Sequence, residues 1–186
     1  QYNLDPDSLE QMTGKILKAI EGVVSKKVNL LITVGLEHYT AVKVVSMMEW
    51  VYQPMTDKTI RNLWLWHSIE ETEHKAVAFD VYQYLYGTGL RAYLDRIAVF
   101  TVSLALILAM SSVYTVILMK RDQQLTNWRS WQKFIGLVGR AYRVMIPRFL
   151  AYYRRDFHPN QTDETVLIAR TKSILGLVDS SPALVH

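Results

Sequence analysis

The sequence predicts an all-α protein, on three observations. Hydrophobic residues recur at helical spacings of three and four positions along most of the chain. No run of alternating apolar and polar residues is bounded by turn residues, as a half-buried strand would require. Helix-breaking residues at Pro54, Gly87, Gly89 and Pro159 divide the chain into lengths that suit helices. We therefore expect a single all-helical domain over residues 1–186, which is long enough to bury a core.

Each expected helix is bounded by residues that start or stop helices. Side-chain oxygens of Ser, Thr and Asp accept hydrogen bonds from the free N–H groups of a first turn, whereas Pro or Gly ends a helix. These signals predict helices over residues 8–26, 28–52, 56–87, 90–121, 126–147 and 162–176. Pro147 ends or kinks the fifth helix. The domain then falls into three parts, residues 1–89, 90–159, and 160–186 with a C-terminal helix and tail.

Composition excludes several kinds of site. The chain has no cysteine, which rules out disulfides, zinc–thiolate sites, iron–sulfur clusters and thiol nucleophiles. Its formal net charge of +4 is too small to imply a nucleic-acid partner by itself. A reducing compartment is permitted, so we expect a cytoplasmic protein, with peripheral or integral attachment to the inner membrane as a further expectation.

Two segments differ from ordinary soluble helices. Residues 97–119 contain no charged side chain, which suits either a buried central helix or a helix inserted in or on a membrane. Residues 127–155 carry seven Arg and Lys residues and no acid, interleaved with aromatic residues. This second pattern suits an anionic lipid surface, a nucleic acid, or a solvated helix face above ordinary core aromatics.

The most informative stretch for chemistry contains His67, Glu71 and His74. On a helix that turns about 100° per residue, these three side chains form one stripe over two turns. Glu70 lies on the rim of that stripe, and Glu73 points away from it. Glu71 and His74 form a Glu-x-x-His pair, whose spacing lets one carboxylate and one imidazole reach the same ion. Mixed carboxylate and imidazole ligands favour iron, manganese or zinc over calcium.

The stripe continues as apolar residues on both sides of this cluster, from Ile60 and Leu63 to Val81 and Leu85. Hydrophobic periodicity predicts that this face is turned toward the core. A buried carboxylate beside imidazoles is costly unless it is paired or bound to a metal. The alternative is that the acidic residues and Lys75 form an ordinary solvated face.

A second carboxylate comes from the preceding helix. Glu37 lies on a small, apolar face and precedes Pro54 by as many residues as Glu71 follows it. A helical hairpin that turns at Pro54 would bring Glu37 and Glu71 to the same height. His38 lies about 100° around the helix from Glu37, so we expect it to support or pack against the site rather than bind the ion.

These residues resemble a known family. The segments Leu36-Glu-His-Tyr-Thr-Ala41, Trp66-His-Ser-Ile-Glu-Glu-Thr-Glu-His-Lys75 and Phe157-His-Pro159 are similar to motifs of the bacterial predicted metal-dependent hydrolases. The resemblance covers residues 30–159. It implies a ferritin-like bundle with metal ligands on four helices. It also implies that this chain corresponds to the C-terminal two-thirds, so that two upstream ligand helices would come from the same gene or a second chain. His158 is expected to be structural rather than a ligand.

The resemblance and the residues together favour a metalloenzyme with a dinuclear centre. Glu37 would bridge two divalent ions, Glu71 and His74 would bind one of them, and His67 would be a further ligand or a supporting donor. Glu70 is the candidate catalytic base. Iron is favoured, with manganese or zinc as alternatives, and the reaction would be hydrolysis or oxygen activation on a small-molecule or lipid-like substrate. The alternative function is a membrane-associated helical protein in which the cluster is structural. A nucleic-acid binder is the least favoured hypothesis.

Overall fold

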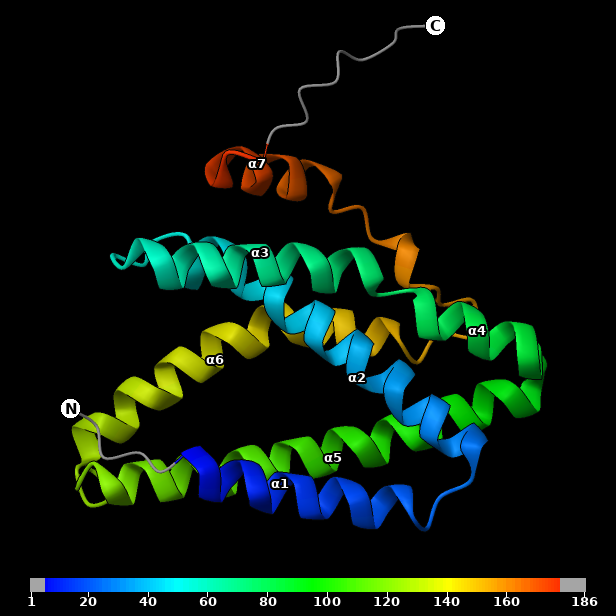
Figure 1. Cartoon of the computed structure of the whole chain (residues 1–186), viewed down its shortest axis with the longest axis horizontal. Helices are drawn as coiled ribbons and strands as arrows, with labels where there is room; N and C mark the ends of the chain where they lie inside the picture. Colours follow the sequence, from blue (N-terminus) through cyan, green and yellow to red (C-terminus); the bar gives the residue numbers. More distant parts are fainter. Residues whose placement is uncertain (1–5, 178–186) are drawn as a thin grey trace, which may run out of the picture.

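The computed structural model describes residues 6–177 and confirms an all-α helical bundle (Figure 1). Among these residues no strand is formed. The helical elements in chain order are α1 (Pro6–Glu21), α2 (Lys26–Met47), η1 (Met48–Tyr52), α3 (Lys58–His74), α4 (Val77–Tyr86), α5 (Leu90–Arg121), α6 (Trp128–Ala151), η2 (Pro159–Gln161) and α7 (Thr165–Leu175). Of these, η1 is a short π-helix and η2 is a short 3₁₀ helix. The expected C-terminal tail lies outside the described residues, as do residues 1–5.

Helix α2 is the centre of the bundle, because it packs against α3, α4, α5 and α6. Its buried side chains join aromatic residues of α4, α5 and α6 in the largest hydrophobic core, which includes Leu31, Val34, Val42, Phe79, Tyr82, Phe100, Phe149, Tyr152 and Phe157. Gly35 lets α5 approach closely, since a Cβ atom there would lie 3.2 Å from Cδ2 of Phe100. The hairpin from α2 to α3 turns after η1, as Pro54 predicted.

Local capping explains several of the helix boundaries. The Ser25 hydroxyl accepts a hydrogen bond from the Val28 N–H and starts α2. The Asp57 carboxylate accepts hydrogen bonds from the first turn of α3 and starts it, as expected. Gly176, with a φ of 69°, ends α7 in the left-handed conformation. The expected helix over residues 28–52 instead becomes a π-helix at its end, and the expected helix over residues 56–87 is interrupted by a turn at Lys75 and Ala76.

Arg96 of α5 connects the end of α6 to the core through hydrogen bonds. Its guanidinium donates hydrogen bonds to the backbone carbonyls of Tyr152 and Arg154, at 2.6 and 2.9 Å, and lies over the Tyr152 ring. The residue is only 4% exposed. A buried cation is therefore satisfied by backbone carbonyl groups of the turn that follows α6.

The apolar helix α5 is not buried. Its buried residues are Ala92, Arg96, Phe100 and Ser103, all in its first half. Of its most apolar 18-residue window, 6% is buried. The structure thus does not support the interpretation of residues 97–119 as a buried central helix. Both α2 and α5 are long and apolar enough to cross a membrane, although half of the α2 window is buried within the bundle.

The C-terminal segment returns to α3, against which α7 packs (Figure 1). Lys75 pairs with Glu164, and its ammonium also donates to the Thr162 carbonyl at 2.9 Å. Lys172 of α7 pairs with Glu73 of α3 at 3.0 Å. These contacts fix α7 beside the helix that carries the candidate metal ligands.

Candidate metal centre

The carboxylate of Glu37 lies beside the turn between α3 and α4. Its Oε2 atom accepts a hydrogen bond from the Ala78 N–H at 3.2 Å. Ala76, the N-cap residue of α4, has no side chain that caps the helix. The carboxylate of Glu37, on helix α2, instead accepts the hydrogen bond from an N–H group in the first turn of α4. A negative charge at a helix N-terminus is also favoured by the helix dipole.

Glu71 and His74 are the charged neighbours of Glu37. Burial raises the pKa of the Glu37 carboxyl above its usual range. The hydrogen bond from Ala78 opposes this rise, Glu71 adds to it through like-charge repulsion, and His74 lowers the pKa. The three side chains are therefore close enough to interact electrostatically across two helices, as a hairpin at Pro54 predicts.

The other candidate residues lie along α3. Nε2 of His67 lies 3.6 Å from Oε1 of Glu71, one helical turn away, with the two side chains 43% and 27% exposed. His74 is exposed at the last position of α3, and Glu70 is half-buried on the rim. Glu73 points away from this cluster and binds Lys172, in agreement with its expected orientation.

The face that carries these residues is turned outward, and the expectation that it faces the core was wrong. Ile60, Leu63, Val81 and Leu85 are all exposed. The buried side of α3 is instead formed by Leu65, Ser68, Ile69 and Thr72. The two hydroxyl residues on that side can be buried because each hydroxyl donates to the carbonyl four residues earlier in the helix.

The donor atoms fit a divalent ion in type but not in number. Carboxylate and imidazole groups suit iron, manganese or zinc. Within residues 6–177, however, no three His, Asp or Glu side chains are gathered closely enough to hold a metal ion. The described part of the chain would thus supply at most a fraction of a coordination shell.

His158 is used within the fold. Its Nδ1 accepts the Asn160 N–H at 3.2 Å, so its Nε2 carries the proton and lies 2.8 Å from Oδ1 of Asp80. Both ring nitrogens thus hold the turn after α6 against α4. This arrangement agrees with the structural role expected for His158.

A family comparison identifies the kind of protein to which this site belongs. The family model described as predicted metal-dependent hydrolase matches residues 1–163. The chain belongs to this family. No curated protein and no solved structure matches the chain. The family description implies a divalent metal and a hydrolase, and it names neither the metal nor the substrate.

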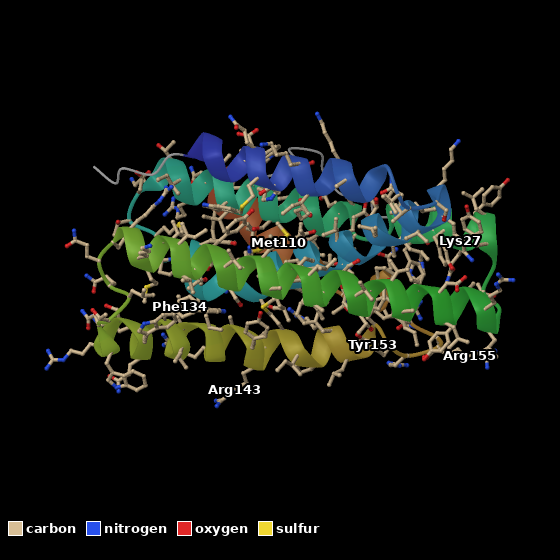
Figure 2. All side chains as sticks on the ribbon, turned by 90° about the horizontal axis from the view of Figure 1, so that it is seen from below. Lys27, Met110, Phe134, Arg143, Tyr153 and Arg155 are labelled. Atoms are coloured by element: carbon tan, nitrogen blue, oxygen red, sulfur yellow. The ribbon has the colours of Figure 1, made fainter. Side chains whose placement is uncertain are left out.

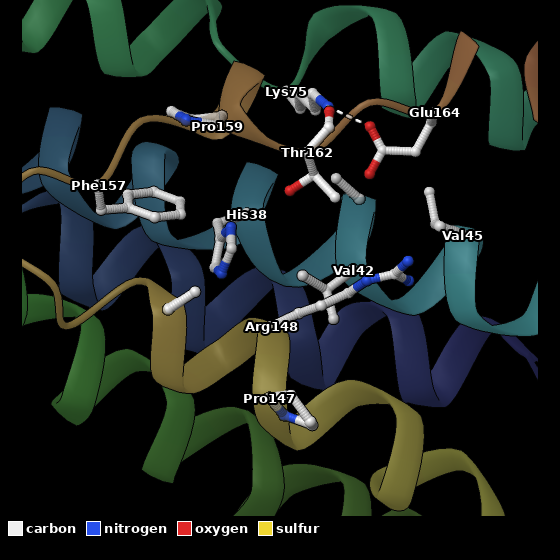
Figure 3. A pocket seen from close by; sticks show the side chains of 12 residues that line it. His38, Val42, Val45, Lys75, Pro147, Arg148, Phe157, Pro159, Thr162 and Glu164 are labelled. Atoms are coloured by element: carbon white, nitrogen blue, oxygen red, sulfur yellow. Dashed lines mark hydrogen bonds and ion pairs between the residues drawn. The ribbon is translucent and has the colours of Figure 1, made fainter. Parts of the chain in front are cut away.

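This family member also has a pocket that the sequence did not predict (Figure 3). The cavity has a volume of about 190 Å³ and lies next to the turn that follows His74. It is lined by His38, Ala41, Val42, Val45, Lys75, Pro147, Arg148, Ala151, Phe157, Pro159, Thr162 and Glu164. These residues come from segments far apart in the sequence. His38, Lys75 and Pro147 were singled out in the sequence, but nothing there predicted that they share one cavity.

His38 forms one wall of this pocket and is 7% exposed. Its ring packs among the rings of Phe100, Phe149, Tyr152 and Phe157. Burial lowers the pKa of His38 to about 4, so the ring is neutral at neutral pH. Its Nε2 atom has no hydrogen-bond partner among the described residues. His38 therefore packs beside the cluster rather than within it.

Proposed function

We propose that this family member is a metal-dependent enzyme whose metal centre uses Glu37, Glu71 and His74, with His67 as a further ligand or a supporting donor. The observation that carries the proposal is the half-buried carboxylate of Glu37, which interacts with a carboxylate and an imidazole from the neighbouring helix. A divalent cation is the simplest group that can neutralise two carboxylates and bind an imidazole together. Iron is our preferred metal, as a pair of ions, with manganese or zinc as alternatives.

The chain's own residues would have distinct roles in such a centre. The Ala78 N–H fixes one oxygen of Glu37 and leaves the other available to an ion. His67 would orient Glu71, and Glu70 on the rim would act as the catalytic base. A bound divalent ion would supply Lewis acidity for hydrolysis, and an iron pair would supply oxidoreductase chemistry with dioxygen. The ferritin-like arrangement is part of this proposal.

The outward-facing stripe of α3 supports a covering element that brings the remaining ligands. Ile60, Leu63 and Trp66 are exposed beside the Glu/His cluster, and contiguous apolar surface around polar groups marks an interaction site. We propose that ligand-bearing helices from outside the described residues, in the same gene product or a second chain, cover this face. The cluster would then become buried, as a carboxylate-rich metal centre requires.

The test separates the two reactions. Metal-free protein is loaded anaerobically with Fe²⁺, Mn²⁺ or Zn²⁺ in parallel and then exposed to air. Oxygen uptake with a ferric charge-transfer band in the iron sample alone would favour oxidoreductase chemistry. Ester or amide hydrolysis with several of the metals would favour a hydrolase. Neither activity nor saturable binding of any of the three ions would refute the proposal.

A second candidate function is a membrane-associated helical protein in which the Glu/His cluster is structural. The exposure of the long apolar helix α5 favours it. The two functions are compatible, because a metalloenzyme attached to a membrane could act on a lipid-like substrate. Flotation of the protein with lipid vesicles tests association, and loss of flotation on metal removal would tie it to the metal centre.

A further inference from the structure

Helices α5 and α6 present a continuous run of exposed apolar side chains. On α5 they are Val102, Leu106, Val113 and Val116, and on α6 they are Trp128, Ile135, Ile146 and Leu150. Each of these side chains is between 45% and 66% exposed. Soluble proteins rarely leave so many large apolar side chains uncovered along neighbouring helices.

Most of the exposed apolar side chains of both helices lie on one side of the helix pair, whereas Leu137 and Val144 of α6 lie on the other. The two helices face each other across a cavity of about 270 Å³ lined by residues such as Leu108 and Thr115 of α5 and Trp131 and Phe134 of α6. At about 100° per residue, the exposed apolar residues lie about a quarter turn from these facing residues on α6 and about a third of a turn from them on α5, in the same rotational sense. Both helices are right-handed and they run antiparallel to each other. Rotations in the same sense from the facing residues therefore place the apolar side chains of both helices on the same side of the pair. Figure 2 shows α5 from this side with α6 alongside it.

Cations border the apolar surface along α6. Residues 123–155 contain seven Arg and Lys residues and no Asp or Glu. On α6, Arg129, Lys133, Arg140 and Arg143 fall on the face turned away from α5. Figure 2 shows Arg143 pointing away from α5, whereas Phe134 lies between the two helices. An apolar surface with a cationic edge is the pattern of a helix that lies at an anionic lipid interface.

We propose that the α5–α6 face is embedded in one leaflet of an anionic bilayer, with both helices in the membrane plane and neither crossing it. This inference rests on the membrane association proposed above and specifies its geometry and lipid. The apolar side chains would enter the acyl region, and the cations of α6 would bind lipid phosphates.

Crossing is disfavoured by the way the chain returns. The start of α5 and the end of α6 are held together at the core by Arg96. If α5 crossed the bilayer, α6 would have to cross back, carrying five cations through hydrocarbon without any acid on that helix.

Other partners fit the charge pattern less well. A symmetric second copy seated on this face would bring two equivalent cationic edges close together, with no acid on α6 to pair with them. A nucleic acid would need the cations at the centre of the contact, where the apolar side chains lie. Both remain as outcomes of the test.

The first arm of the experiment measures binding to vesicles. The intact protein is floated with phosphatidylcholine vesicles and with vesicles containing phosphatidylglycerol. We expect flotation with the anionic vesicles, and at least tenfold weaker partition into the neutral ones. Arg140→Gln with Arg143→Gln should weaken anionic partition about 30-fold, at about 1 kcal/mol for each cation. The control, Lys43→Gln with Lys58→Gln, removes the same charge from α2 and α3 and should leave partition unchanged.

The second arm measures topology with single cysteines, which the cysteine-free chain allows without background. Thr126→Cys lies between α5 and α6, and the control Thr56→Cys lies between η1 and α3. With protein added to preformed vesicles, an impermeant maleimide should label both cysteines at rates within about twofold.

Three results would overturn the proposal. Flotation with a protected Thr126→Cys and a reactive Thr56→Cys would mean that the hairpin crosses the bilayer. If the protein floats with neither kind of vesicle and instead forms dimers in sedimentation, or binds DNA in a salt-sensitive way, the α5–α6 face would be assigned to that other partner. Equal flotation of the α6 variant and its control would remove the role of the cations. Metal content of the same samples reports separately on the proposed metal centre.

Discussion

Replacing Lys75 by Met should destabilise the protein strongly, because it leaves a buried carboxylate without its cation. The Lys75 and Glu164 side chains are only 13% and 9% exposed, and the ammonium also satisfies the Thr162 carbonyl. Removing one partner of a buried ion pair costs about 3–5 kcal/mol. Glu164 lies at the start of a short helix after an exposed segment, so it can move toward water. We therefore expect a loss near the lower limit, about 3 kcal/mol.

Urea unfolding followed by far-ultraviolet circular dichroism measures this loss. The double variant Lys75→Met/Glu164→Leu, which removes both charges, should recover to within about 1 kcal/mol of the original protein. The exposed pair of Arg154 and Asp156 provides the control, since Asp156→Asn should leave the urea midpoint unchanged. Additive losses in the double variant, or an unchanged midpoint for Lys75→Met, would refute the reasoning.

Three further predictions address the core. Arg96→Met removes a buried guanidinium that donates to two backbone carbonyls. The free energy of unfolding, measured in urea, should fall by about 3 kcal/mol. A fall of less than about 1 kcal/mol would contradict this role of Arg96. Gly14→Ala should stabilise the protein by about 0.5–1 kcal/mol, because the added Cβ on α1 meets no other atom. Gly35→Ala should not stabilise it, because the added Cβ would contact Phe100. Equal gains in the two variants would be inconsistent with close packing of α2 on α5. Burial raises the pKa of Tyr82 to about 12, so the folded state keeps a proton that an unfolded tyrosine loses near pH 10. Stability should therefore fall as pH rises from about 10 to about 12, and less steeply in Tyr82→Phe; equal slopes in urea titrations would contradict this.

The fold class could be predicted because helix signals are local. Asp57 and Gly176 bound their helices as the sequence suggests, and the helix over residues 90–121 has the expected limits. The break after His74 could not be predicted from such signals. Neither Lys75 nor Ala76 is a helix breaker, and the cap of α4 comes from Glu37, about 40 residues earlier in the chain.

The orientation of α3 shows why burial is harder to predict than helicity. Apolar residues such as Ile60 and Leu63 beside the Glu/His cluster suggested that this stripe faces the core, yet α2 and α7 cover the opposite side, which includes Ser68 and Thr72. Periodicity identifies an apolar face but not which neighbour covers it, and buried hydroxyls that bond within their own helix look polar in sequence. The apposition of Glu37 with α3 was predictable, since it needs only a hairpin.

The pocket beside the cluster depends on tertiary structure alone. Arg148, Lys75 and Glu164 come from three segments that no sequence spacing relates. Their proximity follows from the tertiary fold, and so does the burial of the His38 nitrogen that has no hydrogen-bond partner within residues 6–177.

Metal analysis of the intact protein tests the central claim most directly. The unmodified protein, a Glu71→Ala/His74→Ala variant and a Glu73→Gln control are purified in parallel, and their bound iron, manganese and zinc are measured by mass spectrometry. Glu73 suits as a control because it lies on the same helix but binds Lys172. We predict bound metal in the unmodified protein and the control, and its loss in the double variant. Equal metal in all three proteins would contradict a centre built on Glu71 and His74.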